Sequence, residues 1–185
     1  RNGWTNLITS SFCAILRKTY RRGGVTSPTG RPPFRIPERQ TTAMRFLTLH
    51  VNAFCCTITK KGRSKVYEDY DDPVTKVDNA LVVLVSVEQG DEENPNRVAR
   101  PASNEIAKLA NQLKVTTIVL HPFAHLFGTL GSPQDAIDIL DRTHQCLIEA
   151  KLDTTRTPFG WFNTLQIDAK GHPLSRVARI VTAGD

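Results

Sequence analysis

Apolar side chains follow strand spacing in the first half of the domain. Residues 45–50 and 53–60 have this spacing, which predicts two strands joined by a tight turn at Val51-Asn52. Residues 80–88 form an almost continuous apolar run, typical of a strand that is buried on both faces. The polar segment 60–79 between them predicts a long surface loop.

Helical spacing replaces strand spacing in two later stretches. In residues 98–113 apolar side chains recur every three or four positions, which predicts a helix with one buried face. A second helix is expected to begin at Ser132, because serine caps helix N-termini and Pro133 suits the first helical position. The side chains expected on its buried face are Ala136, Ile137, Leu140, His144, Leu147 and Ile148.

Further strands are expected at 116–120 and 159–168, followed by a last segment at 174–181. Strands and helices therefore alternate, which predicts a compact α/β domain with a mixed sheet and a helical layer. The composition changes near residue 43, so we expect an extended basic N-terminal arm at 1–43 and the domain at 44–185.

Charge is divided unevenly between the arm and the domain. Residues 1–43 contain eight Lys or Arg and one acidic residue, a net +7, whereas residues 44–185 have a net charge of −1. Such an arm is typical of contact with nucleic acid, an acidic protein or a lipid surface, although a solvated terminus has the same composition. The residues expected to contact RNA are Arg17, Lys18, Arg21, Arg22, Arg31 and Arg35.

The arm has two sections. Apolar residues between Trp4 and Leu16 recur at helical spacing and precede basic residues. This pattern occurs in mitochondrial targeting sequences and in helices that lie on a membrane or on a neighbouring protein. Residues 23–37 are rich in Gly, Ser and Pro and predict an extended linker. We therefore expect the mitochondrial matrix as the location, with the cytoplasm as the alternative.

The cysteines give no sign of a metal site or a disulfide framework. Cys13, Cys55, Cys56 and Cys146 form neither a CxxC pair nor a zinc-binding spacing, so we expect free thiols, no metal and no cofactor. No apolar run reaches the roughly 18 residues that a membrane-spanning helix needs.

Two motifs carry the best candidates for chemistry. Residues 121–126 read His-Pro-Phe-Ala-His-Leu, and residues 158–163 read Pro-Phe-Gly-Trp-Phe-Asn, followed by Gly-His-Pro-Leu at 171–174. Each combines proline with small residues next to an expected strand, where the backbone can approach a ligand closely.

These motifs, in this order, resemble the N-terminal editing domain of archaeal threonyl-tRNA synthetase. The opening strand from Met44, the run 80–88 and the acidic turn 91–95 are also similar, so the resemblance extends from about Met44 to about Val181. It implies a D-aminoacyl-tRNA deacylase-like fold and hydrolysis of the ester between a wrong amino acid and the tRNA 3′ end. A second, hydrolytic site is needed because serine differs from threonine by one methyl group. The loss of one methyl group allows a binding pocket to discriminate by only about 1–3 kcal/mol.

The resemblance also implies which residues form the editing pocket. The catalytic positions are His125, Asn163 and Arg176, of which the family pattern has lysine at 163 and glutamate at 176. The implied substrate-binding residues are His50, Asn52, Pro122, Phe123, Ala124 and Phe162. Position 52 is also changed, because the family pattern has aspartate there.

Two functions stay open at this point. Three changed charged positions on a retained scaffold favour a non-catalytic subunit of a large mitochondrial assembly, a ribosome first and a respiratory complex second, anchored by the basic arm. The alternative is a freestanding aminoacyl-tRNA deacylase acting on seryl-tRNA(Thr), since hydrolysis in this family could rely on backbone groups and the 2′-hydroxyl of the tRNA. The expected partners are ribosomal or transfer RNA and neighbouring proteins. A membrane surface at residues 4–16 and a second copy of the chain are further candidates.

Overall fold

The computed structural model describes residues 43–124, 126 and 129–182. Residues 1–42 of the predicted arm, with its amphipathic segment and linker, lie outside these residues. So do the RNA-contact and catalytic candidates Arg17, Lys18, Arg21, Arg22, Arg31, Arg35 and His125.

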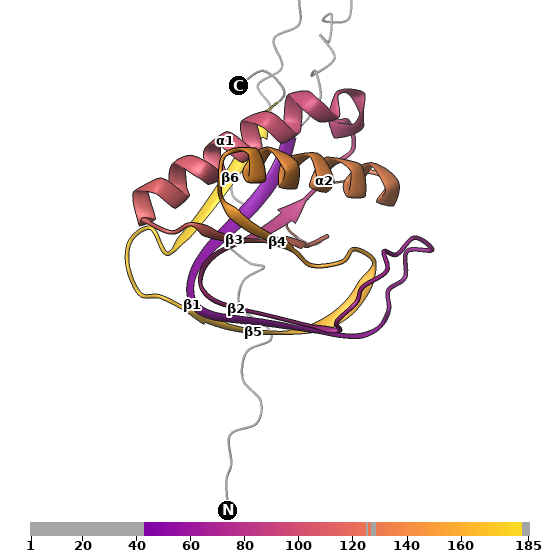
Figure 1. Ribbon diagram of the computed structural model, residues 1–185. Coiled ribbons are helices and arrows are strands. Elements are labelled where there is room, and N and C mark those ends of the chain that lie inside the picture. The colour runs from indigo at the N-terminus through magenta and orange to yellow at the C-terminus, as the bar shows by residue number, and fades with distance from the viewer. Residues whose placement is uncertain (1–42, 125, 127–128, 183–185) are drawn as a thin grey trace, which may run out of the picture. The chain divides into compact units, whose positions relative to one another are not determined.

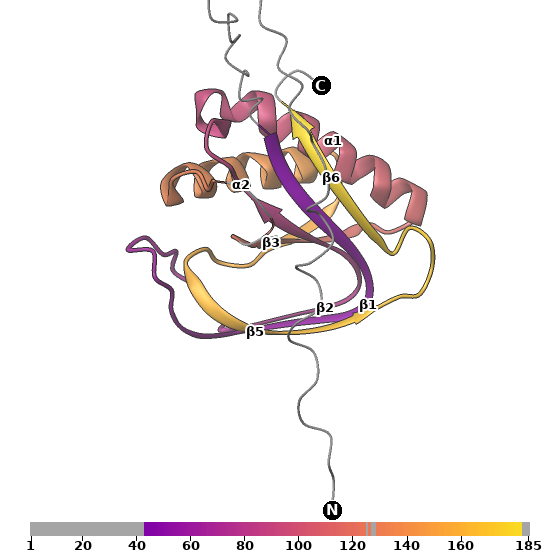
Figure 2. The same cartoon turned by 180° about the vertical axis from the view of Figure 1, so that it is seen from behind.

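One mixed sheet of six strands organises the domain (Figures 1 and 2). The strands are β1 (Ala43–Lys61), β2 (Val74–Ser86), β3 (Thr117–Pro122), β4 (Asp153–Arg156), β5 (Trp161–Ala169) and β6 (Arg176–Thr182). Their order is β4-β3-β2-β1-β5, and β6 also pairs with β1. Strands β2, β3 and β4 are parallel to one another, while β1 is antiparallel to β2, β5 and β6. The predicted α/β class with a mixed sheet is confirmed.

Strand β1 continues where the sequence predicted a turn. The prediction of a hairpin at Val51-Asn52 was wrong, because β1 runs through this point and its register with β5 shifts there by one residue. Asn79 on the neighbouring strand has a left-handed φ of 46°, which asparagine tolerates better than most residues. A bulge bends a strand, and the far ends of β1, β2 and β5 curl away from the helices (Figure 1). The connection between β1 and β2 comes later, at residues 62–73, so the polar loop is shorter than expected.

Two helices, α1 (Pro95–Leu113) and α2 (Pro133–Glu149), cover one face of the sheet (Figure 1). Helix α1 begins three residues before the predicted start, because the Asn94 side chain accepts a hydrogen bond from the Arg97 N–H and caps the helix. Helix α2 begins as predicted, with the Ser132 hydroxyl accepting from the Asp135 N–H. A short 3-10 helix, η1 (Asp91–Glu93), precedes α1.

The buried face of α2 differs from the predicted one. Ile139 and Thr143 are fully buried, whereas Ile137 and His144 are half-buried and Ile148 is exposed. Helix α2 packs against α1 as well as against the sheet. The sequence of α2 alone does not show on which side α1 lies.

Apolar side chains fill both faces of the central strands. One cluster lies between the sheet and the helices and includes Phe46, Leu81 and Leu120. A second cluster, inside the curl, includes Phe54 and Val119. Residues 80–87 are buried throughout, which confirms the prediction of a strand that is covered on both sides.

Candidate functional site

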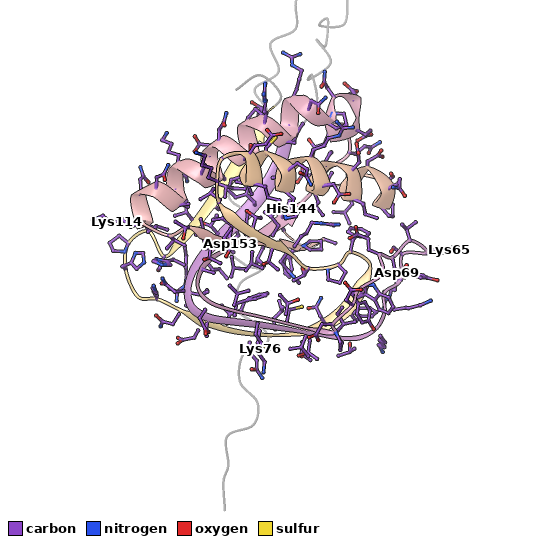
Figure 3. The ribbon with its side chains drawn as sticks, viewed as in Figure 1. Lys65, Asp69, Lys76, Lys114, His144 and Asp153 are labelled. Atoms are coloured by element: carbon purple, nitrogen blue, oxygen red, sulfur yellow. The ribbon has the colours of Figure 1, made fainter. Side chains whose placement is uncertain are left out.

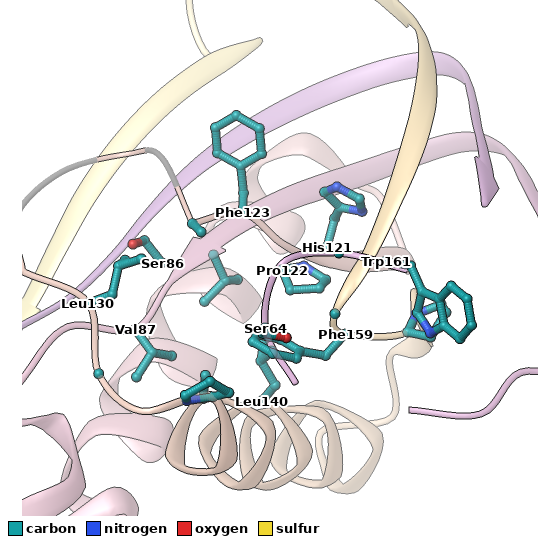
Figure 4. A pocket seen from close by; sticks show the side chains of 18 of the residues that line it. Ser64, Ser86, Val87, His121, Pro122, Phe123, Leu130, Leu140, Phe159 and Trp161 are labelled. Carbon is teal, nitrogen blue, oxygen red and sulfur yellow. The ribbon is translucent and has the colours of Figure 1, made fainter. Parts of the chain in front are cut away.

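A cavity of about 640 Å³ opens at the carboxyl ends of the parallel strands β2 and β3 (Figure 4). Ligands of open α/β sheets commonly bind at this end of the strands, and the volume is in the range of small-molecule sites. Its wall is formed by the strand ends (85–87 and 121–124), by Leu130 and Gly131, by Pro133, Ala136 and Leu140, and by residues 62–64 and 158–163. Both motifs that the sequence singled out therefore meet here.

The Pro-Phe-Gly motif shapes the cavity through its backbone. Gly160 has a φ of 89°, and a Cβ at this position would collide with the Val66 carbonyl oxygen and lie 2.8 Å from Tyr67 Cα. The Gly62 N–H donates to the Gly160 carbonyl oxygen at 2.7 Å, and the Glu68 N–H donates to the Phe159 carbonyl oxygen at 3.1 Å. Glycine is required at 160 because the loop after β1 is fastened directly onto this turn.

Glu68 holds the same loop with its side chain. The Arg156 guanidinium binds both carboxylate oxygens, one at 2.7 Å, and the Phe159 N–H donates to one of them at 2.8 Å. Arg156 also lies 2.9 Å from an Asp141 carboxylate oxygen on α2. Burial disfavours the charge on Arg156, but Glu68 and Asp141 outweigh burial and raise its pKa. Sequence reasoning missed this ion pair, because 88 residues separate its partners and Glu68 lies in a segment that was predicted to be a surface loop.

His121 is the buried histidine of the wall. It is 2% exposed, its Nδ1 lies 2.8 Å from the Thr157 hydroxyl, and burial lowers its pKa to about 4. The imidazole is therefore neutral at pH 7 and can donate or accept a hydrogen bond, but it cannot serve as a cationic acid there.

Five predicted site residues lie together around the cavity: Pro122, Phe123, Ala124, Phe162 and Asn163. Asn163 and Leu165 lie two positions apart in β5, so their side chains share one face of the strand. Leu165 packs in the cluster inside the curl, and Asn163 therefore faces the same side. Among the described residues, its amide makes one hydrogen bond, a long one of 3.4 Å to the Trp161 carbonyl oxygen. Phe162 alternates to the opposite face and is 44% exposed.

Three other predicted site residues do not line the cavity. Arg176 is exposed at the start of β6, opposite Leu49. His50 is buried, with its Nδ1 2.9 Å from His172 Nε2 and its Nε2 3.0 Å from Lys170 Nζ. Burial is the main cause that lowers the His50 pKa.

Asn52 is the third of these residues. It is exposed and donates to an Asp168 carboxylate oxygen at 3.1 Å. The substrate roles of His50, Asn52 and Arg176 therefore stay predictions, without support from their position beside the cavity.

Ser86 is a wall residue that the sequence did not single out. It is 1% exposed, and its hydroxyl has no hydrogen-bond partner within the described residues. Since a buried hydroxyl without a partner costs free energy, Ser86 is a candidate for contact with a bound ligand. No pattern in the sequence distinguishes this serine from a strand residue that faces the core.

The described wall is apolar with a few neutral polar groups. Arg63 is its one charged side chain, and none of its described residues is a carboxylic acid or a lysine. In the part of the chain that the structure describes, no three His, Cys, Asp or Glu side chains are grouped to hold a metal ion. No helix among the described residues is long and apolar enough to cross a membrane. The cavity suits a small polar ligand that is bound by neutral hydrogen bonds and apolar contact.

Comparison with known proteins points to one family. Residues 44–181 match the model of the archaea-specific editing domain of threonyl-tRNA synthetase. The chain is 38% identical over 140 residues to the threonine–tRNA ligase of Methanocaldococcus jannaschii, covering 76% of this chain and 22% of that protein. The ligase of Methanopyrus kandleri is also 38% identical, over 141 residues that cover 75% of this chain and 22% of that protein. The chain thus spans about a fifth of the length of these relatives.

The fold has a solved counterpart. A structure of a probable eukaryotic D-amino acid tRNA deacylase has a TM-score of 0.55 and 10% identity, covering 75% of this chain and 98% of that one. This likeness confirms the predicted D-aminoacyl-tRNA deacylase-like fold. The family match over residues 44–181 and the 38% identity to the archaeal ligases show that the chain belongs to the family of archaea-specific editing domains of threonyl-tRNA synthetase.

Proposed function

We propose that the cavity binds the aminoacylated 3′ end of a tRNA and hydrolyses the ester, with seryl-tRNA(Thr) as the substrate. One observation carries the proposal: the residues that carry the family motifs, 122–124 and 158–163, converge on a single cavity of about 640 Å³. This volume can hold an amino acid and part of its nucleoside.

The reaction needs a nucleophile, a proton acceptor and stabilisation of the negative carbonyl oxygen. Water adds to the carbonyl carbon, the bond to the ribose oxygen breaks, and the amino acid leaves while the ribose hydroxyl takes up a proton. The described wall has no carboxylate to accept the proton, so the adjacent 2′-hydroxyl of the tRNA is the group we expect to orient the water. Backbone N–H groups at the ends of β2 and β3 would stabilise the oxyanion.

Asn163 affects the rate in this scheme. Where the family pattern has a lysine, its amide retains a hydrogen-bond donor but has no charge. Hydrogen bonds from a charged donor are roughly twice as strong as neutral ones. We therefore expect a slower enzyme than one with lysine at this position.

The test compares the full-length chain with a variant whose cavity is blocked. Ala124 lines the cavity and is exposed, so Ala124→Trp fills the entrance without entering the core. Ala178→Trp, at an exposed position of β6, is the matched control. Serine release from seryl-tRNA(Thr) should fall by at least about ten-fold in Ala124→Trp and stay unchanged in Ala178→Trp. Equal rates in the two variants would remove the cavity from the reaction.

A second candidate is a non-catalytic subunit that keeps the fold and has lost the chemistry. The weakly held, uncharged Asn163 in the cavity wall favours it. Under this proposal wild type does not accelerate hydrolysis, and Asn163→Lys restores measurable serine release. Membership of a mitochondrial assembly and location in the matrix stay predictions, because they rest on residues 1–43.

A further inference from the structure

One cationic side chain belongs to the cavity wall, and it comes from the connection between β1 and β2. Arg63 lines the cavity, and no other residue of the described wall is a lysine, an arginine or a carboxylic acid. Its side chain is exposed and forms no ion pair with a described residue. No described partner therefore occupies this positive charge before a ligand enters the cavity.

The backbone on both sides of Arg63 is fixed. The Gly62 N–H donates to the Gly160 carbonyl oxygen at 2.7 Å, and a Cβ at position 62 would collide with that oxygen. On the other side, the Ser64 hydroxyl donates to the Val66 carbonyl oxygen at 2.5 Å. The Cα atom of Arg63 is therefore held at the wall, which lowers the entropic cost when its side chain meets a ligand.

The nearest anchored carboxylate of the same connection does not compete for Arg63. The Arg156 guanidinium and the Phe159 N–H hold the Glu68 carboxylate, and Asp141 lies beside the same guanidinium. Arg156 therefore neutralises Glu68, and the charge of Arg63 is not cancelled within the described wall.

The proposed reaction creates an anion inside this cavity. Water adds to the carbonyl carbon of the ester, and the electron pair of the C=O double bond moves onto the oxygen, which becomes negative. The double bond then re-forms as the bond to the ribose oxygen breaks, and the proton lost by the water passes to that ribose oxygen. A cation beside the carbonyl oxygen lowers the barrier without taking part in the proton transfer.

A guanidinium suits that oxygen better than the other polar side chains of the described wall. Burial lowers the His121 pKa to about 4, so its ring is neutral at pH 7, and the Asn163 amide has no charge. Arginine keeps its charge at any pH at which the domain works. Its hydrogen bonds to an anion are roughly twice as strong as those between neutral groups, and the apolar wall screens its charge less than water does.

We infer that Arg63 is the anion-binding group of the cavity and that it stabilises the negative carbonyl oxygen during ester hydrolysis. The inference rests on the proposed function for the identity of the anion. It adds a residue outside both motifs to the backbone N–H groups at the ends of β2 and β3. Arg63 comes from the polar segment 60–79, in which no local pattern separates it from the other exposed cations.

The test measures kcat and KM for serine release from seryl-tRNA(Thr) by the full-length chain. Arg63→Gln removes the charge and keeps the approximate length of the side chain, whereas Arg63→Lys keeps the charge. Lys65→Gln is the matched control, because it removes a charge from the same connection. Lys65 is exposed at the outer end of that connection (Figure 3) and does not line the cavity.

Arg63→Gln should lower kcat by at least about ten-fold and change KM by less than about two-fold, because the neutral ester gains little from a cation before the water adds. Arg63→Lys should keep at least about a third of the wild-type kcat, because its charge can still act on the oxygen. Lys65→Gln should keep the wild-type kcat, and all three variants should keep the wild-type unfolding midpoint. Equal kcat values for Arg63→Gln and Lys65→Gln would overturn the inference.

A second substrate separates the carbonyl oxygen from the phosphates of the tRNA. Seryl-adenosine carries the same ester but no phosphate, so Arg63→Gln should lower its rate of hydrolysis by the same factor. A loss that is seen with seryl-tRNA(Thr) and is absent with seryl-adenosine would place Arg63 on a phosphate and overturn the inference.

A binding measurement distinguishes failure of this inference from failure of the proposed function. In a phosphonate analogue of seryl-adenosine, a negatively charged tetrahedral phosphorus replaces the carbonyl carbon, and binding of this analogue needs no turnover. If wild type releases serine but Arg63→Gln binds the phosphonate as tightly as wild type does, the inference fails and the proposed function stands. If wild type binds the phosphonate at least about ten-fold more tightly than Arg63→Gln does but releases no serine, the proposed function fails and the anion-binding role of Arg63 stands.

Discussion

Replacement of Gly160 by alanine tests how the cavity loop is built. A left-handed φ costs a residue with a Cβ about 1 kcal/mol, and the new methyl group collides with the Val66 carbonyl oxygen and Tyr67. The loop has to move to relieve this collision. It then loses the hydrogen bonds from Gly62 to Gly160 and from Glu68 to Phe159, each worth about 1 kcal/mol. The expected total is a loss of about 3 kcal/mol in the free energy of unfolding.

Gly171→Ala is the matched control for this prediction. No atom lies within 4 Å of the Cβ that the substitution would add, and the backbone there is not left-handed. Its unfolding free energy should therefore stay within about 0.5 kcal/mol of wild type. Urea denaturation of the three proteins measures the difference, and a loss of about 3 kcal/mol should lower Tm by about 9 °C. Equal stability of Gly160→Ala and Gly171→Ala would refute the proposed loop geometry.

Three further predictions concern charged and titrating groups. Glu68→Gln should lower the unfolding free energy by about 3 kcal/mol. Asp69 is exposed and forms no ion pair with a described residue, so Asp69→Asn should change the unfolding free energy by less than about 0.5 kcal/mol in the same urea titration. Because the His121 pKa is lowered to about 4 in the folded state, unfolding takes up a proton below pH 6.5. As the pH falls from 6.5 to 4, His121 should lower the free energy of unfolding of wild type by up to about 3 kcal/mol. His121→Asn should not show this loss. The Asp91 pKa is raised by burial to about 6, so this group stabilises the fold below pH 4 and the stabilisation is lost as the pH rises through 6. Asp91→Asn should be less sensitive to pH over that range, as pH-dependent denaturation would show.

The layers of this fold could be predicted from local patterns, and its bend could not. The run 80–88 and the Ser132-Pro133 cap identify a buried strand and a helix start, because burial and capping depend on neighbouring residues in the chain. The bend at Asn52 and Asn79 depends on pairing between strands, so the sequence pattern at Val51-Asn52 was misread as a turn. Strand β4 was missed for the same reason, since its four largely polar residues become a strand only through pairing with β3.

Some residues of the candidate site could be predicted from the sequence, and others could not. The motif residues 122–124 and Asn163 converge as expected, since each follows or begins a strand whose end faces the cavity. Ser86 and the Glu68–Arg156 pair were missed, because nothing near them in the sequence shows that they meet across the fold. His50 lies away from the cavity, because its strand carries it to a cluster with Lys170, and its substrate role stays a prediction.

The rate of serine release from seryl-tRNA(Thr) by the full-length chain is the most direct test of the central claim. It should be measured against spontaneous hydrolysis and against release of threonine from threonyl-tRNA(Thr) at the same enzyme concentration. An editing enzyme should release serine above the spontaneous rate and at least about ten-fold faster than threonine. Release of neither amino acid above the spontaneous rate would contradict an editing enzyme and leave the cavity a binding site alone.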